Sequence, residues 1–391
     1  MRKKIIGSIF FLFTCLLYSS ANDSLIHRLI RRLDQLQLHH ESYFPQGLFP
    51  SYQQYSTKEH PLKNDVNIFF TGLTAVTLKQ LRPYLQQEDQ IICDSIFQRI
   101  KIVAAKFKNR KGRNTYNFWP TDTLKLFSNT GVLKFVAGQK AIADDLDDTV
   151  AMLIVLDEPD SSIRSLHAFM QGFTNKKGIS TKTALKGYEN FDAYSTWFGK
   201  KMTVELDACI LSNILGMIQT YDLEWTKADS ASLDFLTKMV KQKDYVDHPD
   251  IMSVYYKTTP IILYHLSRLM SIKPIAPLEQ YKKQLIDDAI QIYSTSNNLL
   301  DKMILRTALL RWGVSLPGEL VITENIQDDI EHNDFNFFIG NVACAMPRYI
   351  AFPLFNSGLT RYYFYCPAYN DVLVLEYLIL QKRFDERKPA N

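Results

Sequence analysis

The chain has 391 residues, of which 46% are hydrophobic and 22% are charged, with a formal net charge of +4 at pH 7. This composition excludes a disordered or collagen-like chain, and the length allows a large core without disulfide staples. Arg2, Lys3 and Lys4 supply three of the four excess charges, so the rest of the chain carries 4 − 3 = +1. A nearly neutral protein has no long-range attraction for nucleic acid, and we expect no nucleic-acid partner.

The first 21 residues have the pattern of a secretory signal peptide. The basic start is followed by the apolar run 5–17 and by the small residues Ser19, Ser20 and Ala21. Because the apolar run is shorter than the roughly 20 residues of a membrane helix, we predict cleavage after about Ala21. We therefore expect a periplasmic or secreted protein, with an uncleaved membrane anchor as the alternative.

Apolar residues recur with a helical period along most of the remaining chain, 22–391. The helices that this period predicts are 24–38, 66–81, 91–107, 147–156, 204–220, 230–240, 251–270, 281–295, 299–312, 319–331 and 370–381. No segment keeps a sustained two-residue alternation, so we predict one compact all-α domain of about twelve helices. Helices of this number can close into an (α/α)6 toroid, in which inner helices line a cavity and outer helices cover them. An α-solenoid is the alternative, but no internal repeat of about 30 to 45 residues is visible.

Two connections, 41–63 and 174–197, are longer than a turn and rich in aromatic residues. Long connections in compact domains are often functional, and a disordered spacer rarely carries so many aromatic rings. We expect both segments to be ordered rims of the cavity.

Basic residues cluster around Gly112, and four cysteines follow the signal segment. The basic cluster predicts a solvated loop, with a phosphate or anionic-lipid contact at a membrane surface as the alternative. The cysteines have no C-x-x-C spacing, so we expect no metal site built on them, and their disulfide state stays open. The basic residues are Lys106, Lys108, Arg110, Lys111 and Arg113, and the cysteines are Cys93, Cys209, Cys344 and Cys366.

The most informative stretch is Asp144-Asp145-Leu146-Asp147-Asp148-Thr149, which directly precedes the apolar run 150–156. Acidic residues favour a helix start, because its free N–H groups and its dipole stabilise negative charge there. Four carboxylates exceed what capping needs, and a proton, a metal or a cationic partner must relieve their repulsion. This stretch is therefore the leading candidate for a functional site.

The five residues from Asp145 to Thr149 resemble the Asp-x-Asp-Asp-Thr signature of class II terpene cyclases, such as the squalene–hopene cyclases. The resemblance implies an α-α toroid and a reaction in which the middle aspartate protonates an alkene or epoxide. Carried over to this chain, Asp147 would be the general acid, and Asp145 and Asp148 its flanking carboxylates. The implied substrate is an apolar polyprenyl chain, and no cofactor is needed. The chain is shorter than the squalene cyclases and lacks their repeated Gln-and-Trp motifs.

Alkene protonation agrees with a crowded carboxylate cluster, because adjacent carboxyl groups raise one another's pKa and share protons. Aromatic faces stabilise the resulting carbocation by about 0.5–2 kcal/mol each. Candidate lining residues lie just upstream and further along the chain: Tyr116, Phe118, Trp119, Asp122, Trp197, Tyr255, Tyr256, Tyr365 and Tyr369.

Two other enzyme classes remain open. Asp144, Asp145 and Asp148 also fit the Asp-Asp-x-x-Asp pattern with which class I terpene synthases hold Mg²⁺, although no second metal motif follows. Exported all-α toroids also include polysaccharide hydrolases and lyases, which use paired carboxylates. In that glycan alternative Asp147 or Asp148 would be the acid, Trp119 and Trp197 would stack on sugar rings, and the partner carboxylate would be Asp122, Asp192 or Asp207.

A non-catalytic toroid that binds a lipid, a glycan or a protein is the third hypothesis, in which the acidic cluster starts a helix or docks a cation. Asp207 and Asn213 lie near or within an apolar helix and point about 120° apart. We expect one of them to face the cavity and the other to cap the helix or lie on the surface. The oligomeric state stays open.

Overall fold

The computed structural model describes residues 23–55, 61–122, 143–175, 185–199, 204–318, 326–331, 335–341 and 358–387, with the single residues Leu320 and Leu354. Most of this part of the chain is helical, as the sequence predicted. The helices are the segment 23–36, α2 (Phe69–Leu81), the 3-10 turn η1 (Arg82–Tyr84), α3 (Gln87–Ala104), α4 (Leu146–Val155), α5 (Asp160–Met170), α6 (Ala208–Thr220), α7 (Lys227–Gln242), α8 (Asp244–Asp247), α9 (Pro249–Met252), α10 (Thr259–Ile272), α11 (Ala276–Glu279), α12 (Lys282–Thr295), α13 (Leu299–Arg311), α14 (Ile326–Glu331) and α16 (Pro367–Glu386).

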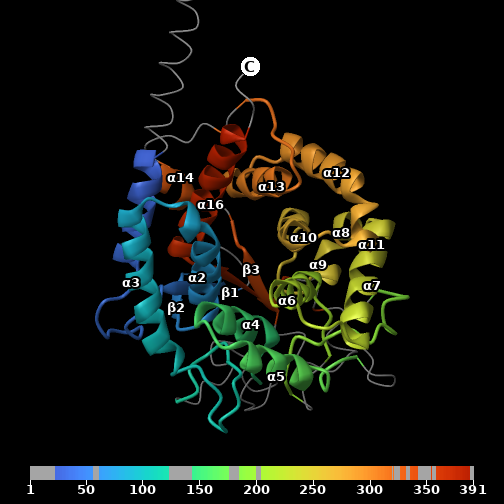
Figure 1. Ribbon diagram of the computed structural model, residues 1–391, viewed down its shortest axis with the longest axis horizontal. Helices are drawn as coiled ribbons and strands as arrows, with labels where there is room; N and C mark the ends of the chain where they lie inside the picture. Colours follow the sequence, from blue (N-terminus) through green and yellow to red (C-terminus); the bar gives the residue numbers. More distant parts are fainter. Residues whose placement is uncertain are drawn as a thin grey trace, which may run out of the picture.

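Six of these helices pack in a cyclic order. Each of α2, α4, α6, α10, α13 and α16 packs against the next, and α16 returns to α2. In Figure 1 helices α3, α5, α7 and α12 lie outside this group of six. The described helices therefore form an inner set and a partial outer set.

The inner and outer helices differ in how much of their surface is buried. Helix α2 is buried around its whole circumference from Phe69 to Leu78, as expected for a helix that other elements surround. Helix α3 buries one face, with Cys93, Ile96 and Ile100, and exposes much of the other. The apolar stripe of an outer helix thus faces the inner set, while its polar side faces solvent.

Gly72 allows two inner helices to approach closely. A Cβ atom at this position would lie 3.0 Å from Met152 Cε and 3.3 Å from the Cβ of Ala151. Helix α2 therefore packs against α4 where no larger side chain would fit without a shift. This contact helps to fix the position of α4, whose first turn carries the acidic motif.

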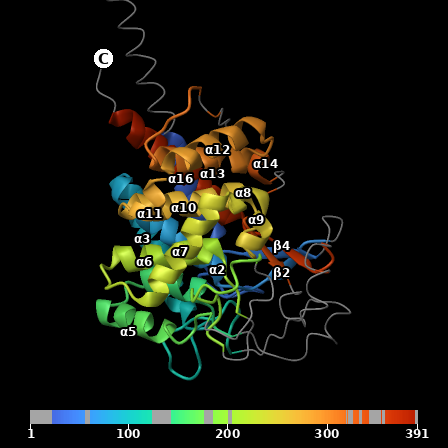
Figure 2. The ribbon, with the colours of Figure 1, turned by 90° about the vertical axis from the view of Figure 1, so that its right-hand side faces the viewer.

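A four-stranded antiparallel sheet lies on one side of the helical body, where Figure 2 labels β2 and β4. Its strands are β1 (Ser51–Tyr55), β2 (Lys63–Asp65), β3 (Phe338–Asn341) and β4 (Arg361–Tyr365), in the order β2-β1-β4-β3. Tyr52 is paired with Tyr365, and Phe338 with Phe364, so the sheet joins segments from both ends of the chain.

The sheet corrects the expectation of an all-α fold. Its strands are three to five residues long, too short to give a sustained alternation. In β4 the partly exposed residues Tyr363 and Tyr365 are aromatic, and so are the buried residues Tyr362 and Phe364. The sequence therefore shows no alternation of polar and apolar residues there. The segment 41–63, predicted to be an ordered rim without helical period, contributes β1 and the first residue of β2.

Three of the four cysteines lie in the described part of the chain. Cys93, Cys209 and Cys366 are free and buried, whereas Cys344 and the predicted signal peptide 1–21 lie outside the described residues. Within the described residues, no helix has the length and apolar character needed to cross a membrane.

Candidate functional site

The acidic motif forms the first turn of α4. Asp145 is the N-cap, and its Oδ1 accepts a hydrogen bond of 2.7 Å from the backbone N–H of Asp148. The hydroxyl of Thr149 donates to the carbonyl of Asp145 at 2.6 Å. Capping by aspartate is ordinary, but here Asp145 and Asp147 are only 5% exposed and Asp148 only 1%. The carboxyl groups are thus withdrawn from the water that usually solvates a helix start.

Two irregular segments hold the helix start from opposite sides. The backbone of Asp145 forms isolated bridges with Tyr116 and with Trp197. The N–H of Asp145 donates to the carbonyl of Tyr116 at 3.2 Å, and the N–H of Tyr116 donates to Thr149 Oγ1 at 2.9 Å. On the other side, the N–H of Leu146 donates to the carbonyl of Thr196 at 2.8 Å. These contacts fix the backbone that carries the carboxyl groups.

Asp147 accepts a hydrogen bond on each of its two oxygens. Asn213 Nδ2 on α6 donates to Oδ1 at 2.7 Å, and the hydroxyl of Tyr256 donates to Oδ2. Asn213 Oδ1 in turn accepts from the guanidinium of Arg268 on α10. Burial raises the pKa of Asp147, although the hydrogen bonds from Tyr256 and Asn213 and the charge of Arg268 oppose this shift. The first turn of α4, helix α6 and the segment before α10 therefore meet at this carboxyl group.

Asp145 and Asp148 form a carboxyl pair beside it. Burial raises the pKa of Asp145 to about 7. Burial, and then the charge of Asp145, raise the pKa of Asp148 well above its ordinary value. Within the described part of the chain, Asp148 Oδ2 is buried and has no hydrogen-bond partner. The pair therefore favours holding a proton at neutral pH.

Asp144, the fourth carboxylate, has different partners. Its Oδ2 accepts hydrogen bonds from the hydroxyl of Thr115 and from Asn109 Nδ2, and Arg113 Nη2 lies 3.5 Å away. Among the described residues, no group of three His, Cys, Asp or Glu side chains is arranged to hold a metal ion. The partners of Asp144 thus agree poorly with the alternative in which Asp144, Asp145 and Asp148 bind Mg²⁺.

Aromatic rings gather next to Asp147, around Phe338 of β3. The ring of Phe338 stacks on Tyr255 with centroids 5.5 Å apart and planes 6° apart. It also lies 4.5 Å from Phe69 and 5.8 Å from both Phe118 and Tyr256. Because Tyr256 also bonds Asp147, the ring cluster is continuous with the carboxyl cluster.

The predicted lining residues are only partly brought together. Tyr116, Trp197, Tyr255 and Tyr256 adjoin the acidic turn, the first two through the backbone of Asp145. Tyr369 is buried and contacts Phe337 at 4.6 Å, within the ring cluster that includes Tyr256.

Phe118 lies in the same ring cluster, whereas three of the predicted lining residues lie elsewhere. Trp119 Nε1 donates to Asp65 Oδ1 at 3.1 Å, so its polar edge points towards the sheet. Tyr365 is half-buried in β4, and its ring lies 6.4 Å from that of Tyr52. Asp122 is exposed.

The carboxylates considered for glycan cleavage are engaged or exposed. Asp207 caps α6 and accepts hydrogen bonds from the hydroxyl of Ser253 at 2.7 Å and from the N–H of Tyr255 at 3.0 Å. Burial raises the pKa of Asp207 to about 6. Asp192 accepts a hydrogen bond from the hydroxyl of Thr174.

Asp207 and Asn213 have different roles, and one of them caps the helix, as the sequence predicted. Asp207 caps α6, while Asn213 reaches the acidic turn.

Sequence reasoning missed Arg268, Glu205 and the ring pair Phe337–Phe338. Glu205 Oε2 accepts from Trp197 Nε1 at 2.9 Å and from the hydroxyl of Tyr255. Single arginine, glutamate and phenylalanine residues are common along any chain, so no local signal singled them out. The run Asn336-Phe337-Phe338, two residues before Gly340, was the nearest hint.

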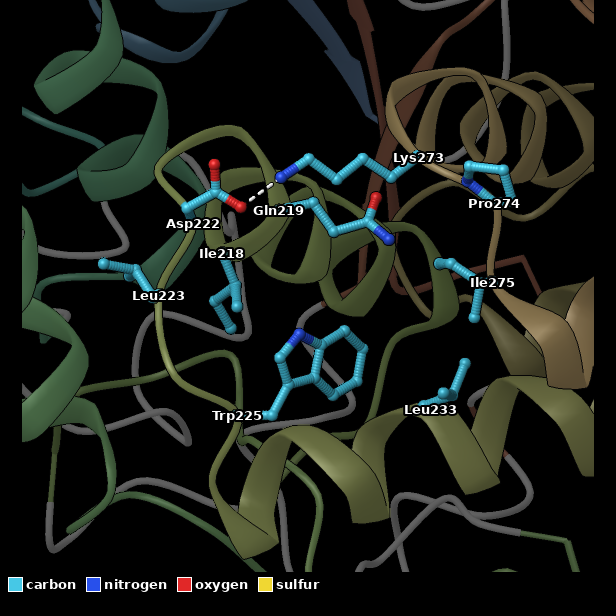
Figure 3. Close-up of a pocket in the computed structure, with 9 residues that line it drawn as sticks. All are labelled: Ile218, Gln219, Asp222, Leu223, Trp225, Leu233, Lys273, Pro274 and Ile275. Carbon is cyan, nitrogen blue, oxygen red and sulfur yellow. Dashed lines mark hydrogen bonds and ion pairs between the residues drawn. The ribbon is translucent and has the colours of Figure 1, made fainter.

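A separate pocket of about 450 Å³ lies towards the far ends of two inner helices. Its lining includes Ile218 and Gln219 of α6, Leu233 of α7, Trp225, and an ion pair between Asp222 and Lys273 (Figure 3). Ile218 and Gln219 lie in the last turn of α6, and Lys273 directly follows α10. The lining of the pocket includes no residue of the acidic turn.

Comparisons of this chain with models of protein families, with curated proteins and with solved structures found no match.

Proposed function

We propose that this chain is an (α/α)6 toroid enzyme of the terpenoid-cyclase type. In this proposal, the carboxyl cluster Asp145, Asp147 and Asp148 donates a proton to an alkene of an apolar polyprenyl substrate, without a cofactor. The cation then closes rings and loses a proton, so the overall reaction is an isomerisation. The observation that carries the proposal is the burial of all three motif aspartates in one helical turn, next to aromatic rings.

The cyclic packing of α2, α4, α6, α10, α13 and α16 supports the toroid. An inner set of helices with outer helices around it is the arrangement that a toroid requires (Figure 1). Hydrogen bonds join the first turn of α4 to α6 and to the segment before α10, and they join that segment to the N-cap of α6. These three segments would lie at one end of the proposed ring.

The electrostatics of the cluster support general-acid chemistry. A general acid must hold its proton near the working pH, and burial with like charges raises the pKa values of Asp145 and Asp148 in that direction. Aromatic faces at Phe338, Tyr255 and Phe69 are suited to stabilise a carbocation. Sugar hydrolysis would need a second carboxylate free to act across a cavity, and Asp207 is already held by several donors.

The protein would act after export, with a signal peptide of residues 1–21 removed. A polyprenyl substrate dissolved in a membrane can be reached from the outer side, which is consistent with a peripheral membrane contact. Neither a nucleic-acid partner nor a metal enters this mechanism.

The test is product analysis by mass spectrometry with the chain from residue 22 onward. Linear polyprenyl hydrocarbons, alcohols and diphosphates are supplied with and without a chelator. We expect a cyclised product that survives chelation and that Asp147→Asn reduces by about 100-fold or more, the scale of losing an acid–base group or a group that stabilises charge in the transition state.

The matched control is Asp157→Asn, because Asp157 follows the same helix but is exposed and paired with Lys79. This variant is expected to keep the parent activity. Loss of product with chelator would assign the carboxylates to metal binding instead. No conversion of any substrate would contradict the proposal and favour a glycan enzyme or a binding scaffold.

A further inference from the structure

The three motif aspartates have different surroundings, which separate their roles. Asp147 has both oxygens occupied by donors, from Asn213 at 2.7 Å and from Tyr256. Asp148 donates its backbone N–H to Asp145, yet its own Oδ2 is buried without a partner among the described residues. A carboxyl group that only accepts hydrogen bonds is best satisfied when it is ionised, and an unpartnered buried oxygen is least costly on a neutral group.

The side-chain amide of Asn213 connects Asp147 to the positive charge of Arg268. Its Nδ2 donates to Asp147, and its Oδ1 accepts from Arg268, so the amide has one orientation that satisfies both neighbours. The positive charge of Arg268 thereby reaches Asp147 through a single side chain. Among the described residues, no comparable donor supports a negative charge on Asp148.

We propose that Asp148 carries the transferable proton in a proton-sharing pair with Asp145, while Asp147 remains the anion that faces the developing cation. Asn213 and Arg268 are positioning residues that keep Asp147 ionised. This assignment rests on the proposed function for its chemistry. It differs from the role that the class II resemblance gives to Asp147.

The proton balance of the step is complete. The O–H bond of Asp148 breaks as a C–H bond forms at one alkene carbon, and the π electrons of the alkene supply the new bond. The neighbouring carbon becomes the cation, and the Asp145–Asp148 pair gains one negative charge. When the final cation loses a proton to form a new double bond, that proton or one from solvent restores the pair.

The ionisable groups around Asp148 come from its own turn and from the elements packed on α4. Asp145 and Asp147 are the charges that act on it directly. On α2 the only ionisable residue is Lys79, which is paired with Asp157 beyond the far end of α4. The others in this neighbourhood are Asp144 with Arg113, Tyr116, Asp207 at the start of α6, Tyr256, and Arg268 on α10.

The experiment is infrared difference spectroscopy of the substrate-free protein, comparing each variant with the parent near pH 7. Protonated carboxyl groups give a C=O band that carboxylates lack. We expect Asp148→Asn to lose one such band and Asp147→Asn to keep it. Loss of the band in Asp147→Asn with retention in Asp148→Asn would overturn the assignment, and so would loss in both or in neither.

A second variant keeps the assignment testable if Asp148→Asn fails to fold. In Asp145→Asn the band should persist at acid pH, but its midpoint should fall by more than about one pH unit, because the neighbouring charge is gone. An unchanged midpoint would contradict proton sharing. These readouts need no substrate, so they separate the proton assignment from the choice of reaction.

Discussion

Asp145 combines two roles that usually occur at different sites. It caps α4 through Oδ1, and it lies in a buried group of three carboxyls. Burial raises its pKa to about 7, whereas an unfolded chain would show the ordinary value near 4. The folded protein therefore binds a proton at this turn more tightly than the unfolded chain does.

The stability of the protein should depend on pH through this residue. A raised pKa gives a contribution that is present below about pH 4 and is lost as the pH rises through about 7. Asparagine caps a helix as well as aspartate does, but it does not titrate. Between pH 5 and pH 8 the parent should lose up to about 3 kcal/mol more unfolding free energy than Asp145→Asn loses.

Urea unfolding followed by circular dichroism at several pH values measures this difference. The exposed Asp157→Asn serves as the control and should follow the parent. Equal pH slopes for the parent and Asp145→Asn would contradict a raised pKa at this turn.

At the scale of helices, buried polar contacts link three members of the inner set. Tyr264 of α10 donates its hydroxyl to Glu376 of α16 at 2.6 Å. Arg311 of α13 pairs with Glu376 and donates to the carbonyl of Tyr264 at 3.2 Å. The side chains of Arg311 and Glu376 are only 6% and 3% exposed. Removing one partner would leave a buried charge without compensation.

Arg311→Met should therefore destabilise the protein by about 3–5 kcal/mol, the usual cost of breaking a buried ion pair. Lys283→Met is the control, because Lys283 and Asp287 form an exposed pair along α12. The control should change the unfolding free energy by less than about 1 kcal/mol. Denaturant titrations compare the two, and similar small effects would show that the pair does not hold α13 to α16.

Local patterns in the sequence predicted most helices, because a 3.6-residue period is visible without tertiary contacts. The helix 160–170 was missed although Ile163, Leu166 and Met170 follow that period. The predicted helix 251–270 begins only at Thr259, with Pro260 in its first turn, where proline is tolerated. The residues before it form α9 and the irregular stretch that carries Tyr255 and Tyr256.

The sequence predicted the part of the candidate site that is contiguous in the chain. It did not predict the part that long-range contacts bring together. The acidic turn is contiguous, so Asp145, Asp147 and Asp148 could be named from the sequence. Tyr256 lies 109 residues from Asp147, and only packing brings them together. The sheet escaped prediction for the same reason, since Tyr52 and Tyr365 pair across almost the whole chain.

In the whole molecule, polar and aromatic side chains from distant elements lie close together. The carboxyl turn of α4, the amide of Asn213 on α6 and the hydroxyl of Tyr256 converge on one point. Phe69 of α2 and Phe338 of β3 pack against each other and against Tyr256, which lies before α10. In the proposed reaction, an exchangeable carboxyl proton from this point is transferred to an alkene.

Product formation in deuterated water tests this proton transfer. The carboxyl proton exchanges with solvent, so our account predicts one deuterium in the cyclised product, at the carbon that is protonated first. Mass spectrometry counts the label, and NMR locates it. A product without deuterium at that carbon would contradict proton donation by the buried carboxyl cluster.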